Sequence, residues 1–460
     1  MNPNRLFYLV ALLLLIIPVG GRAITLDEAI QEALTHSQEI KIAEYEMAAV
    51  NAQGDEIVSF TLPQISIEAG HMFMGADKEN PLKGLIGKEP EGIDTSSPIA
   101  QMMADALMAY NDQTIGVLYP EFEIPDQQTL LTLKFSQVLF AGGNVWNSWR
   151  LKKGMATQAD LARRITVATL RKDVKTRFNT VLFKEAYLKI LKDRVSQGED
   201  ELNDAKGLMS AGLVTSLDLR YAKLKINMAI NSMKEAEVEF RNAMIDFNSI
   251  IGRTSDKPLL MPDGVFDRGG RLSEKIALLK KRLADESLLA VQALQRKRDL
   301  ALINEKMAKG EFFPKVALIG GVEYTDKETT DPYTAWSAGA QLSWDLFSGG
   351  ATRAKKVNAF NKVRSAEEEL ALTKKETGNL ISKLAEQAKI LNQRIVLHQE
   401  AVSLAAENYQ DARSQYRAGT LTQTQMGEFH LAYSEARFGL VTLYFMERGM
   451  EIEVEAQLEE

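Results

Sequence analysis

The chain has 460 residues, of which 55 are Lys or Arg and 62 are Asp or Glu, and it contains no Cys. The net charge of −7 argues against nucleic acid as a partner, because nucleic-acid binding needs a basic surface that neutralises phosphates. The lack of Cys excludes a disulfide framework.

The N-terminus has the layout of a secretory signal peptide. Arg5 precedes the apolar stretch 6–18, and cleavage is expected after Ala23, so residues 1–23 are predicted to be removed on export. Loss of Arg5 and Arg22 leaves 53 basic residues against 62 acidic ones, a net charge of −9. No later stretch offers the roughly 18 uncharged apolar residues of a membrane-spanning helix, so any membrane insertion must use strands.

Two motifs recur at one fixed distance. Leu-Phe-x-Gly-Gly occupies residues 139–143 and 346–350, and Ala-Gly-x-x-Thr occupies residues 211–215 and 418–422. Both pairs are 207 positions apart, which indicates an internal duplication without insertions between the two motifs.

The duplication extends upstream with a change of offset. Pro63 and Pro314 are 251 positions apart, so the first copy carries an insertion of about 44 residues, placed within 74–127 and expected on the extracellular side if the flanking strands cross the membrane. Each copy is predicted to run helix, strand, loop, strand, long helix, tip and returning helix. The predicted divisions are a first repeat over 24–251 with its tip near 212, a linker rich in Pro and Gly over 252–272, and a second repeat over 273–460 with a strand pair over 314–348 and its tip near 419.

Four segments alternate apolar and polar residues, as strands with one apolar face do. In the clearest of them, the even-numbered positions from Trp336 to Trp344 are apolar, and the positions between them are mostly polar. The two Trp residues are about 26 Å apart at roughly 3.3 Å per residue, which fits an apolar membrane band between two aromatic girdles. The same alternation occurs over 64–69, 131–136 and 315–324. A half-buried sheet of a soluble domain is the alternative.

Four strands cannot close a membrane barrel by themselves. The smallest barrels have about eight strands, and an open edge in lipid leaves backbone groups without partners. Several chains must therefore share one barrel, and three chains would supply twelve strands.

The segments that follow the strands predict long helices. From Gly350 to Gly419 there is no Pro, and apolar residues recur at alternating spacings of three and four, which is a coiled-coil seam. The matching segment 143–211 would be about 100 Å long at roughly 1.5 Å per residue. The shorter helices predicted over 26–60, 215–250, 273–312 and 422–454 can pair with these two in stacked couples. A plain coiled-coil rod is the alternative, but it does not explain the attached strand pairs.

Taken together, these landmarks resemble the TolC-like outer membrane factor family over almost the whole mature chain. The resemblance implies a mainly α fold with a small β part: long antiparallel coiled-coil helices forming a trimeric α-barrel, continued by a 12-stranded transmembrane β-barrel. It implies a homotrimer in outer-membrane lipid, with its helical tunnel in the periplasm. It also implies a periplasmic adaptor and an inner-membrane transporter as partners, in a tripartite efflux pump or a type I secretion system.

The resemblance also assigns sites by position. The adaptor-docking tips would be Gly212, Leu213, Val214, Thr215, Gly419, Thr420 and Leu421. The gate candidates would be Asp218, Tyr416, Gln425 and Glu428, with Asp218 and Tyr416 at the positions of a closed-state latch. Two positions depart from the family pattern, since Leu421 replaces a basic latch residue and Gln425 replaces an acid. Turn formation by the glycines, packing of Tyr416 in the seam and an ordinary exposed Glu428 are the alternatives.

An enzyme is the other class of function to consider. The histidines at 36, 71, 398 and 430 show no metal-ligand spacing, and neither a nucleophile elbow nor a phosphate loop is present. The sequence thus predicts no catalytic residue, no cofactor and no metal site. A structural periplasmic spacer or adaptor without a channel is the second functional hypothesis.

Overall fold

The computed structural model describes residues 23–73, 98–103, 105–106, 127–253, 258–327 and 330–459. Almost all of the predicted signal peptide lies outside these residues, and so does the predicted insertion apart from helical residues 98–103 and 105–106 and the strand residue Gln127. The chain divides into a helical unit of residues 1–54, 151–302 and 358–460, and a strand unit of residues 55–150 and 303–357.

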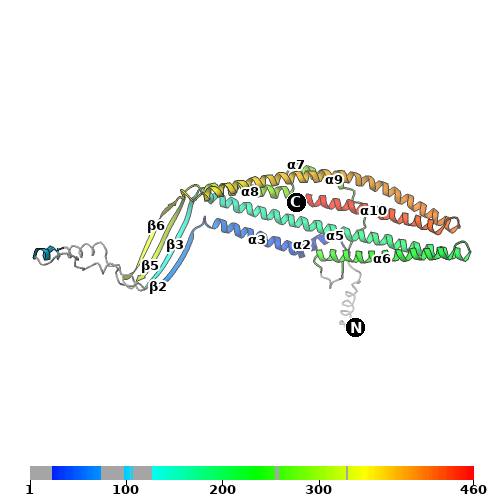
Figure 1. Ribbon diagram of the computed structural model, residues 1–460, viewed down its shortest axis with the longest axis horizontal. Coiled ribbons are helices and arrows are strands. Elements are labelled where there is room, and N and C mark those ends of the chain that lie inside the picture. The colour runs from blue at the N-terminus through cyan, green and yellow to red at the C-terminus, as the bar shows by residue number, and fades with distance from the viewer. Residues whose placement is uncertain are drawn as a thin grey trace, which may run out of the picture. The chain divides into compact units, whose positions relative to one another are not determined.

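The two halves of the chain have the same order of elements (Figure 1). The first half runs α2 (Leu26–His36), α3 (Gln38–Ser59), β2 (Gln64–Phe73), β3 (Gln127–Ala141), α5 (Asn144–Ser210) and α6 (Ser216–Ile250). The second runs α7 (Leu272–Ala284), α8 (Leu289–Gly310), β5 (Lys315–Lys327), β6 (Thr330–Ser343), α9 (Ala351–Arg417) and α10 (Gln423–Leu458). Helices α5 and α9 have 67 residues each, about 100 Å at roughly 1.5 Å per residue.

The helices before the strands are each divided in two, where the sequence predicts one. Ser37 separates α2 from α3, and its hydroxyl accepts hydrogen bonds from the backbone N–H groups of Glu39 and Ile40, so it caps the start of α3. In the second half, the break between α7 and α8 contains Glu286 with a positive φ of 54°. A local side-chain cap and a left-handed residue therefore interrupt two otherwise continuous apolar patterns.

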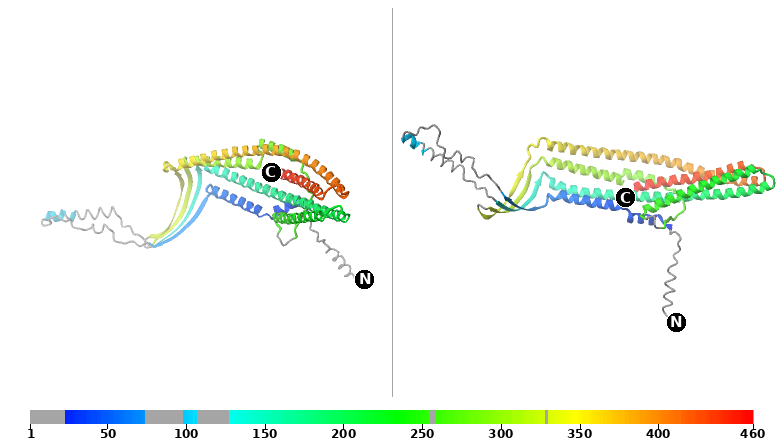
Figure 2. Two further views of the ribbon diagram at one scale, coloured as in Figure 1. Left: turned by 45° about the vertical axis from the view of Figure 1, so that its right-hand side comes forward. Right: turned by 60° about the horizontal axis from the view of Figure 1, so that its bottom comes forward.

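Within the helical unit, α3, α5, α8 and α9 lie side by side in that order (Figure 2). The buried residues of α9 recur at the predicted spacings of three and four, and they include Ile381, Leu384, Ala388, Leu391, Ile395, Tyr409, Ala412 and Tyr416. Between Ile395 and Tyr409 the predicted seam positions His398, Val402 and Ala405 are only half-buried. The two halves also build similar cores. One joins α2, α3, α5 and α6 around Phe247, and the other joins α7, α8, α9 and α10 around Leu279.

Two two-residue strands, β1 (Ala23–Ile24) and β4 (Met261–Pro262), pair in parallel beside the first core. None of the helices among the described residues combines the length and the apolar character needed to cross a membrane.

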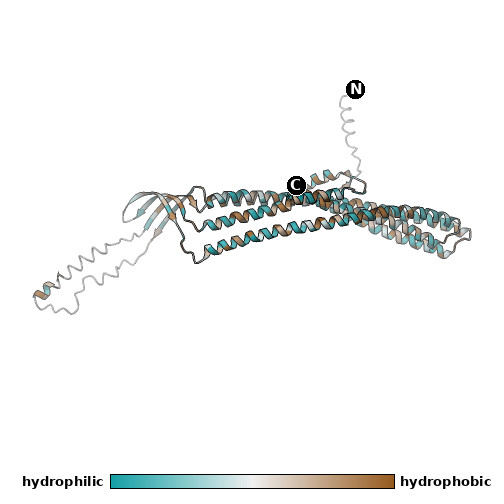
Figure 3. Ribbon diagram, turned by 90° about the horizontal axis from the view of Figure 1, so that it is seen from above, coloured by the Kyte–Doolittle hydropathy of each residue, from teal (hydrophilic) through white to brown (hydrophobic). Residues whose placement is uncertain are grey.

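The strand unit is one antiparallel sheet in the order β2-β3-β5-β6. Its register aligns the apolar positions of all four strands: Ile67 lies opposite Leu133, Leu133 opposite Val322, and Val322 opposite Trp336. Because directly opposed residues share a face, one side of the sheet is largely apolar, with Gln137 opposite Leu318 as a polar exception, and the strands alternate brown and teal in Figure 3. The other side carries an ion pair between Lys134 and Glu68 at 2.6 Å.

Two features at the ends of the strands complete this unit. The sequence predicts a strand that includes Trp344, but β6 ends one residue earlier, at Ser343. The indole Nε1 of Trp344 donates a hydrogen bond to the carbonyl oxygen of Phe312 at 3.1 Å. At the corner between β3 and α5, Gly142 has a φ of +59°, and a Cβ there would lie 2.0 Å from the carbonyl oxygen of Gly310. Only glycine fits this corner, which explains the first Leu-Phe-x-Gly-Gly motif.

Candidate gate and docking tips of the helical hairpins

Each long helix forms a hairpin with the helix that follows it: α5 with α6, the first hairpin, and α9 with α10, the second hairpin (Figure 1). Both turns have the same backbone. Gly212 and Gly419 adopt left-handed φ angles of 75° and 71°, and the N–H groups of Leu213 and Thr420 donate to the carbonyl oxygen five residues earlier, at 2.9 and 3.1 Å. This is the helix end that a left-handed glycine just beyond the last helical residues allows.

The returning helices begin with matching caps. In the first hairpin, the hydroxyl of Thr215 accepts from the N–H of Asp218 at 3.3 Å, and the Asp218 carboxylate accepts from the N–H of Thr215 at 2.9 Å. In the second hairpin, Thr422 and Gln425 form the same reciprocal pair. These capping boxes satisfy backbone donors that the first turn of a helix leaves free. The sequence reasoning named Asp218 and Gln425 as gate candidates but missed this local role.

The predicted docking residues lie on the surface at the two turns. Gly212, Leu213, Thr215, Gly419 and Thr420 are exposed, and Leu213 has 62% of its surface accessible. Val214 and Leu421 are half-buried. The two turns are neighbours, because a Cβ on Gly419 would lie 3.7 Å from Cδ1 of Leu213. The tips thus offer one exposed surface with an apolar side chain at its centre.

The two latch positions lie near each other without a hydrogen bond between them. Tyr416 is fully buried; burial, and next the negative charge of Asp218, raise the pKa of its hydroxyl to about 12. In the described part of the chain this hydroxyl has no hydrogen-bond partner. Hydrogen bonds from Thr215 engage the Asp218 carboxylate and hold its pKa below the usual range. A latch between Asp218 and Tyr416 therefore stays a prediction for the assembled protein.

The other two gate candidates, Gln425 and Glu428, are exposed in the first two turns of α10. Gln425 is engaged in its capping box. Among the described residues, Glu428 forms no hydrogen bond or ion pair with the other gate candidates, so a ring of acidic groups at an entrance is a matter for an assembly of several chains.

A buried polar cluster joins the hairpins a little above the tips, and the sequence reasoning missed it. Glu201 on α5, Tyr409 on α9 and His430 on α10, here called the Glu201 cluster, are 6%, 5% and 7% exposed. The Tyr409 hydroxyl donates to Oε1 of Glu201 at 3.1 Å, and Nδ1 of His430 lies 2.8 Å from the same oxygen. The three residues come from three helices, so no spacing along the chain could have revealed them.

Ion pairs at the edge of the same interface also join the hairpins. Asp204 on α5 pairs with Arg417 on α9 at 2.9 Å, and Asp193 on α5 pairs with Arg437 on α10 at 2.8 Å. Acidic groups therefore belong to the first hairpin and basic groups to the second along this edge. Exposed pairs of this kind contribute little stability singly, but they select which surfaces meet.

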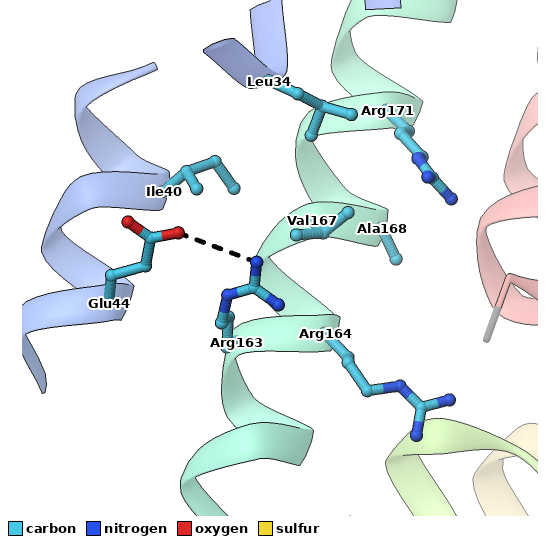
Figure 4. A pocket seen from close by; sticks show the side chains of 8 residues that line it. All are labelled: Leu34, Ile40, Glu44, Arg163, Arg164, Val167, Ala168 and Arg171. Carbon is cyan, nitrogen blue, oxygen red and sulfur yellow. Dashed lines mark ion pairs between the residues drawn. The ribbon is translucent and has the colours of Figure 1, made fainter. Parts of the chain in front are cut away.

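A hollow of about 370 Å³ beside α5 holds three Arg side chains, shown in Figure 4. Arg163 points toward α3 and pairs with Glu44 at 3.7 Å, whereas Arg164 and Arg171 extend from the other side of α5. The three guanidinium groups do not converge on one point, so the hollow is not an evident anion site. Across the described ranges, no group of three or more His, Asp or Glu residues is placed to hold a metal ion.

Comparison with known proteins identifies the family. The family model described as outer membrane efflux protein matches residues 29–253 and 278–442, most of the chain. No curated protein matches the sequence.

Solved structures share the fold at low sequence identity. The outer membrane protein VceC from Vibrio cholerae is 14% identical, with 94% of this chain and 95% of that chain covered and a TM-score of 0.74. The CmeC outer membrane channel from Campylobacter jejuni is 12% identical, with 94% and 85% covered and a TM-score of 0.72. The MtrE outer membrane channel from Neisseria gonorrhoeae, in its open state, is 13% identical, with 94% and 88% covered and a TM-score of 0.68. The chain belongs to the outer membrane efflux protein family, and its place is the outer membrane, with the helices in the periplasm.

Proposed function

We propose that the chain is the outer-membrane channel of a tripartite efflux pump or a type I secretion system. Three copies form one passive duct, and a periplasmic adaptor connects it to an inner-membrane transporter. The observation that carries this proposal is the four-stranded sheet, which among the described residues has two open edges and one largely apolar face.

The open edges require other copies of the chain. Among the strands that the structure describes, β2 and β6 each have a neighbour on one side only. On the apolar face, Ile67 is 70% and Trp336 is 80% exposed. Lipid would cover such side chains favourably, but it would leave the backbone groups of two edge strands unpaired. Edge-to-edge pairing of three copies would remove every edge and give twelve strands, an even number within the known range of membrane barrels.

The tips support the adaptor part of the proposal. The exposed side chain of Leu213 lies between two tight turns and offers a partner a small apolar surface. Gly212 and Gly419 carry no side chain, so the backbone of a partner can approach the turns closely. The proposed docking set is the one predicted from the sequence. Asp218, Tyr416, Gln425 and Glu428 remain the proposed gate, in which opening separates the tips.

Two measurements test the channel. The purified mature protein is expected to migrate as a heat-modifiable trimer and to conduct ions in planar bilayers. A matched pair of variants tests the lipid-facing side: Ala338→Arg is expected to cost about 2–4 kcal/mol of insertion and to reduce trimer yield, whereas Ser337→Arg on the opposite face is expected to insert. Equal effects of the two variants would contradict the assignment of the faces.

A structural spacer or an adaptor without a channel is the competing function. It predicts a water-soluble protein that never conducts, and it leaves the apolar face of the sheet without a partner. For the gate, Asp218→Ala and Tyr416→Phe are expected to raise conductance. Unchanged conductance in both variants would show that these two residues do not form a latch.

A further inference from the structure

The Glu201 cluster occurs once in each chain although the hairpins are duplicated. At the offset of 207 positions, Asn408 corresponds to Glu201 and Lys223 corresponds to His430, and both of these counterparts are exposed. The duplicated fold therefore does not need a buried acid or a buried His to form a hairpin. Within the cluster, the two contacts to Glu201 cross from the first hairpin to the second, while the rings of Tyr409 and His430 lie 5.1 Å apart within the second hairpin. The effect of the Glu201 contacts therefore falls on the joint between the two hairpins.

One carboxylate oxygen connects all three helices of this joint. Burial, and next the charge of Glu201, raise the pKa of the Tyr409 hydroxyl far above its usual range, so the hydroxyl keeps its proton and remains a donor. Oε1 of Glu201 thus receives one hydrogen bond from α9 and lies at hydrogen-bonding distance from Nδ1 of His430 on α10. Hydrogen bonds to a buried charged acceptor are stronger than those between neutral groups, so this oxygen resists separation of the hairpins.

The same joint also contains buried polar atoms that would gain hydrogen bonds to water if the two hairpins separated. Within the described residues, Nε2 of His430 and the hydroxyl of Tyr416 are buried without hydrogen-bond partners. Unpartnered buried polar atoms cost free energy that water returns once they are exposed. When the hairpins separate, a polar joint of this kind can replace its internal hydrogen bonds by hydrogen bonds to water. An apolar joint has no such replacement, so its separation costs more free energy.

We propose that Glu201, Tyr409 and His430 form a buried latch that holds the second hairpin against the first and sets the threshold for opening of the tips. This proposal rests on the proposed channel function. It is separate from the predicted latch between Asp218 and Tyr416, because it uses a different carboxylate and a different tyrosine.

The test records single channels of the full-length trimer in planar bilayers and compares the ratio of time spent open to time spent closed. Glu201→Gln removes the charge and keeps the shape, and it is expected to raise this ratio about tenfold. Tyr409→Phe removes only the hydroxyl, and about a fivefold rise is expected. Glu199→Gln and Tyr45→Phe make the same chemical changes at exposed positions, and both should match the wild type.

Combining the two changes separates a latch from simple packing. Both interactions end on one oxygen, so the double variant is expected to show less than the product of the single effects. If Glu201→Gln and Tyr409→Phe lower only the heat resistance of the trimer and leave the open-to-closed ratio at the control value, the latch is overturned. A wild-type protein that forms no channel overturns the proposed function, and the latch with it.

A cross-link provides a further arm, since the chain has no Cys of its own. Asp204→Cys with Arg417→Cys places one thiol on each hairpin beside the cluster, where the native side chains pair at 2.9 Å. A cleavable bifunctional thiol reagent should cancel the effect of Glu201→Gln on opening, and cleavage should restore it. Unrestricted opening of the cross-linked variant would show that the hairpins do not separate here.

Discussion

The first and second hairpins turn through the same backbone, with different side chains at matched positions. Each has a left-handed glycine and a threonine capping box, 207 positions apart. At one matched position near the turn, Met209 is 37% exposed while Tyr416 is fully buried. At another, the cap uses the carboxylate of Asp218 in one hairpin and the amide of Gln425 in the other. The duplication preserved the turn and left the surroundings free to diverge, because the turn depends on local bonds alone.

The largest expected difference between the hairpins concerns Met209 and Tyr416. Tyr416→Ala removes a fully buried ring from the core at the tip and is expected to cost about 3–5 kcal/mol of unfolding free energy. Met209→Ala at the matched position should cost about 1 kcal/mol or less, because the side chain is partly in water. Urea unfolding of the purified protein measures both. Similar losses would mean that the second tip is not packed as described.

Glycine substitutions should instead destabilise the two turns by the same amount. Gly212→Ala and Gly419→Ala place a side chain at a left-handed φ, and each is expected to cost about 1–2 kcal/mol. Gly207→Ala is the control, since this glycine lies inside α5 with open space around it, and the change should stabilise by up to about 1 kcal/mol. Thermal unfolding distinguishes the opposite signs, and a stabilising change at either turn would contradict the left-handed assignment.

The two capping boxes should also contribute equal stability at neutral pH. Thr215→Ala and Thr422→Ala each remove a capping box, with an expected loss of about 1 kcal/mol at the start of α6 or α10. Amide hydrogen exchange in the first turn of each helix reports the loss where it occurs. Faster exchange that is not confined to the altered hairpin would argue that the cap acts on more than its own helix.

The smallest expected effect is a difference between the caps in acid. The pKa of Asp218 is lowered in the folded chain, so its stabilisation is present above the ordinary value of 3.8 and disappears as the pH falls through the lower folded value. Gln425 has no charge to lose. Below about pH 4, protection of the first turn of α6 should therefore decrease while that of α10 is retained. Asp218→Gln should make the two hairpins behave alike, and a pH response that survives this change would assign it to another group.

Much of the fold could be predicted from local patterns. The alternation around Trp336 depends on a period of two residues that any strand must have, and the register of the sheet then aligned the apolar positions of neighbouring strands. The division of α2 from α3 was missed, because one Ser in a continuous apolar pattern is a weak signal until its hydroxyl is seen capping the next helix.

The candidate site was predictable only in part. The turns at Gly212 and Gly419 follow from glycine at matched positions, but an apolar seam along 143–211 does not point to Glu201, because the structure buries this acid and leaves the neighbouring apolar Leu202 only half-buried. A heptad pattern fixes which stripe is apolar to within about one residue, and a buried acid beside an apolar residue breaks the rule on which the pattern relies.

The sequence by itself determined the duplication, the two glycine turns and the one-sided strands, because each depends on bonds or periods within a few residues of chain. Tertiary structure alone decided that Glu201 meets Tyr409 and His430, and that Tyr416 is buried while Met209 is not. An apolar seam on a helix predicts that another helix packs against it, but it does not identify which helix. The contacts that join one hairpin to the other depend on which helices pack together and at what height, and that information is distributed over segments more than 200 residues apart.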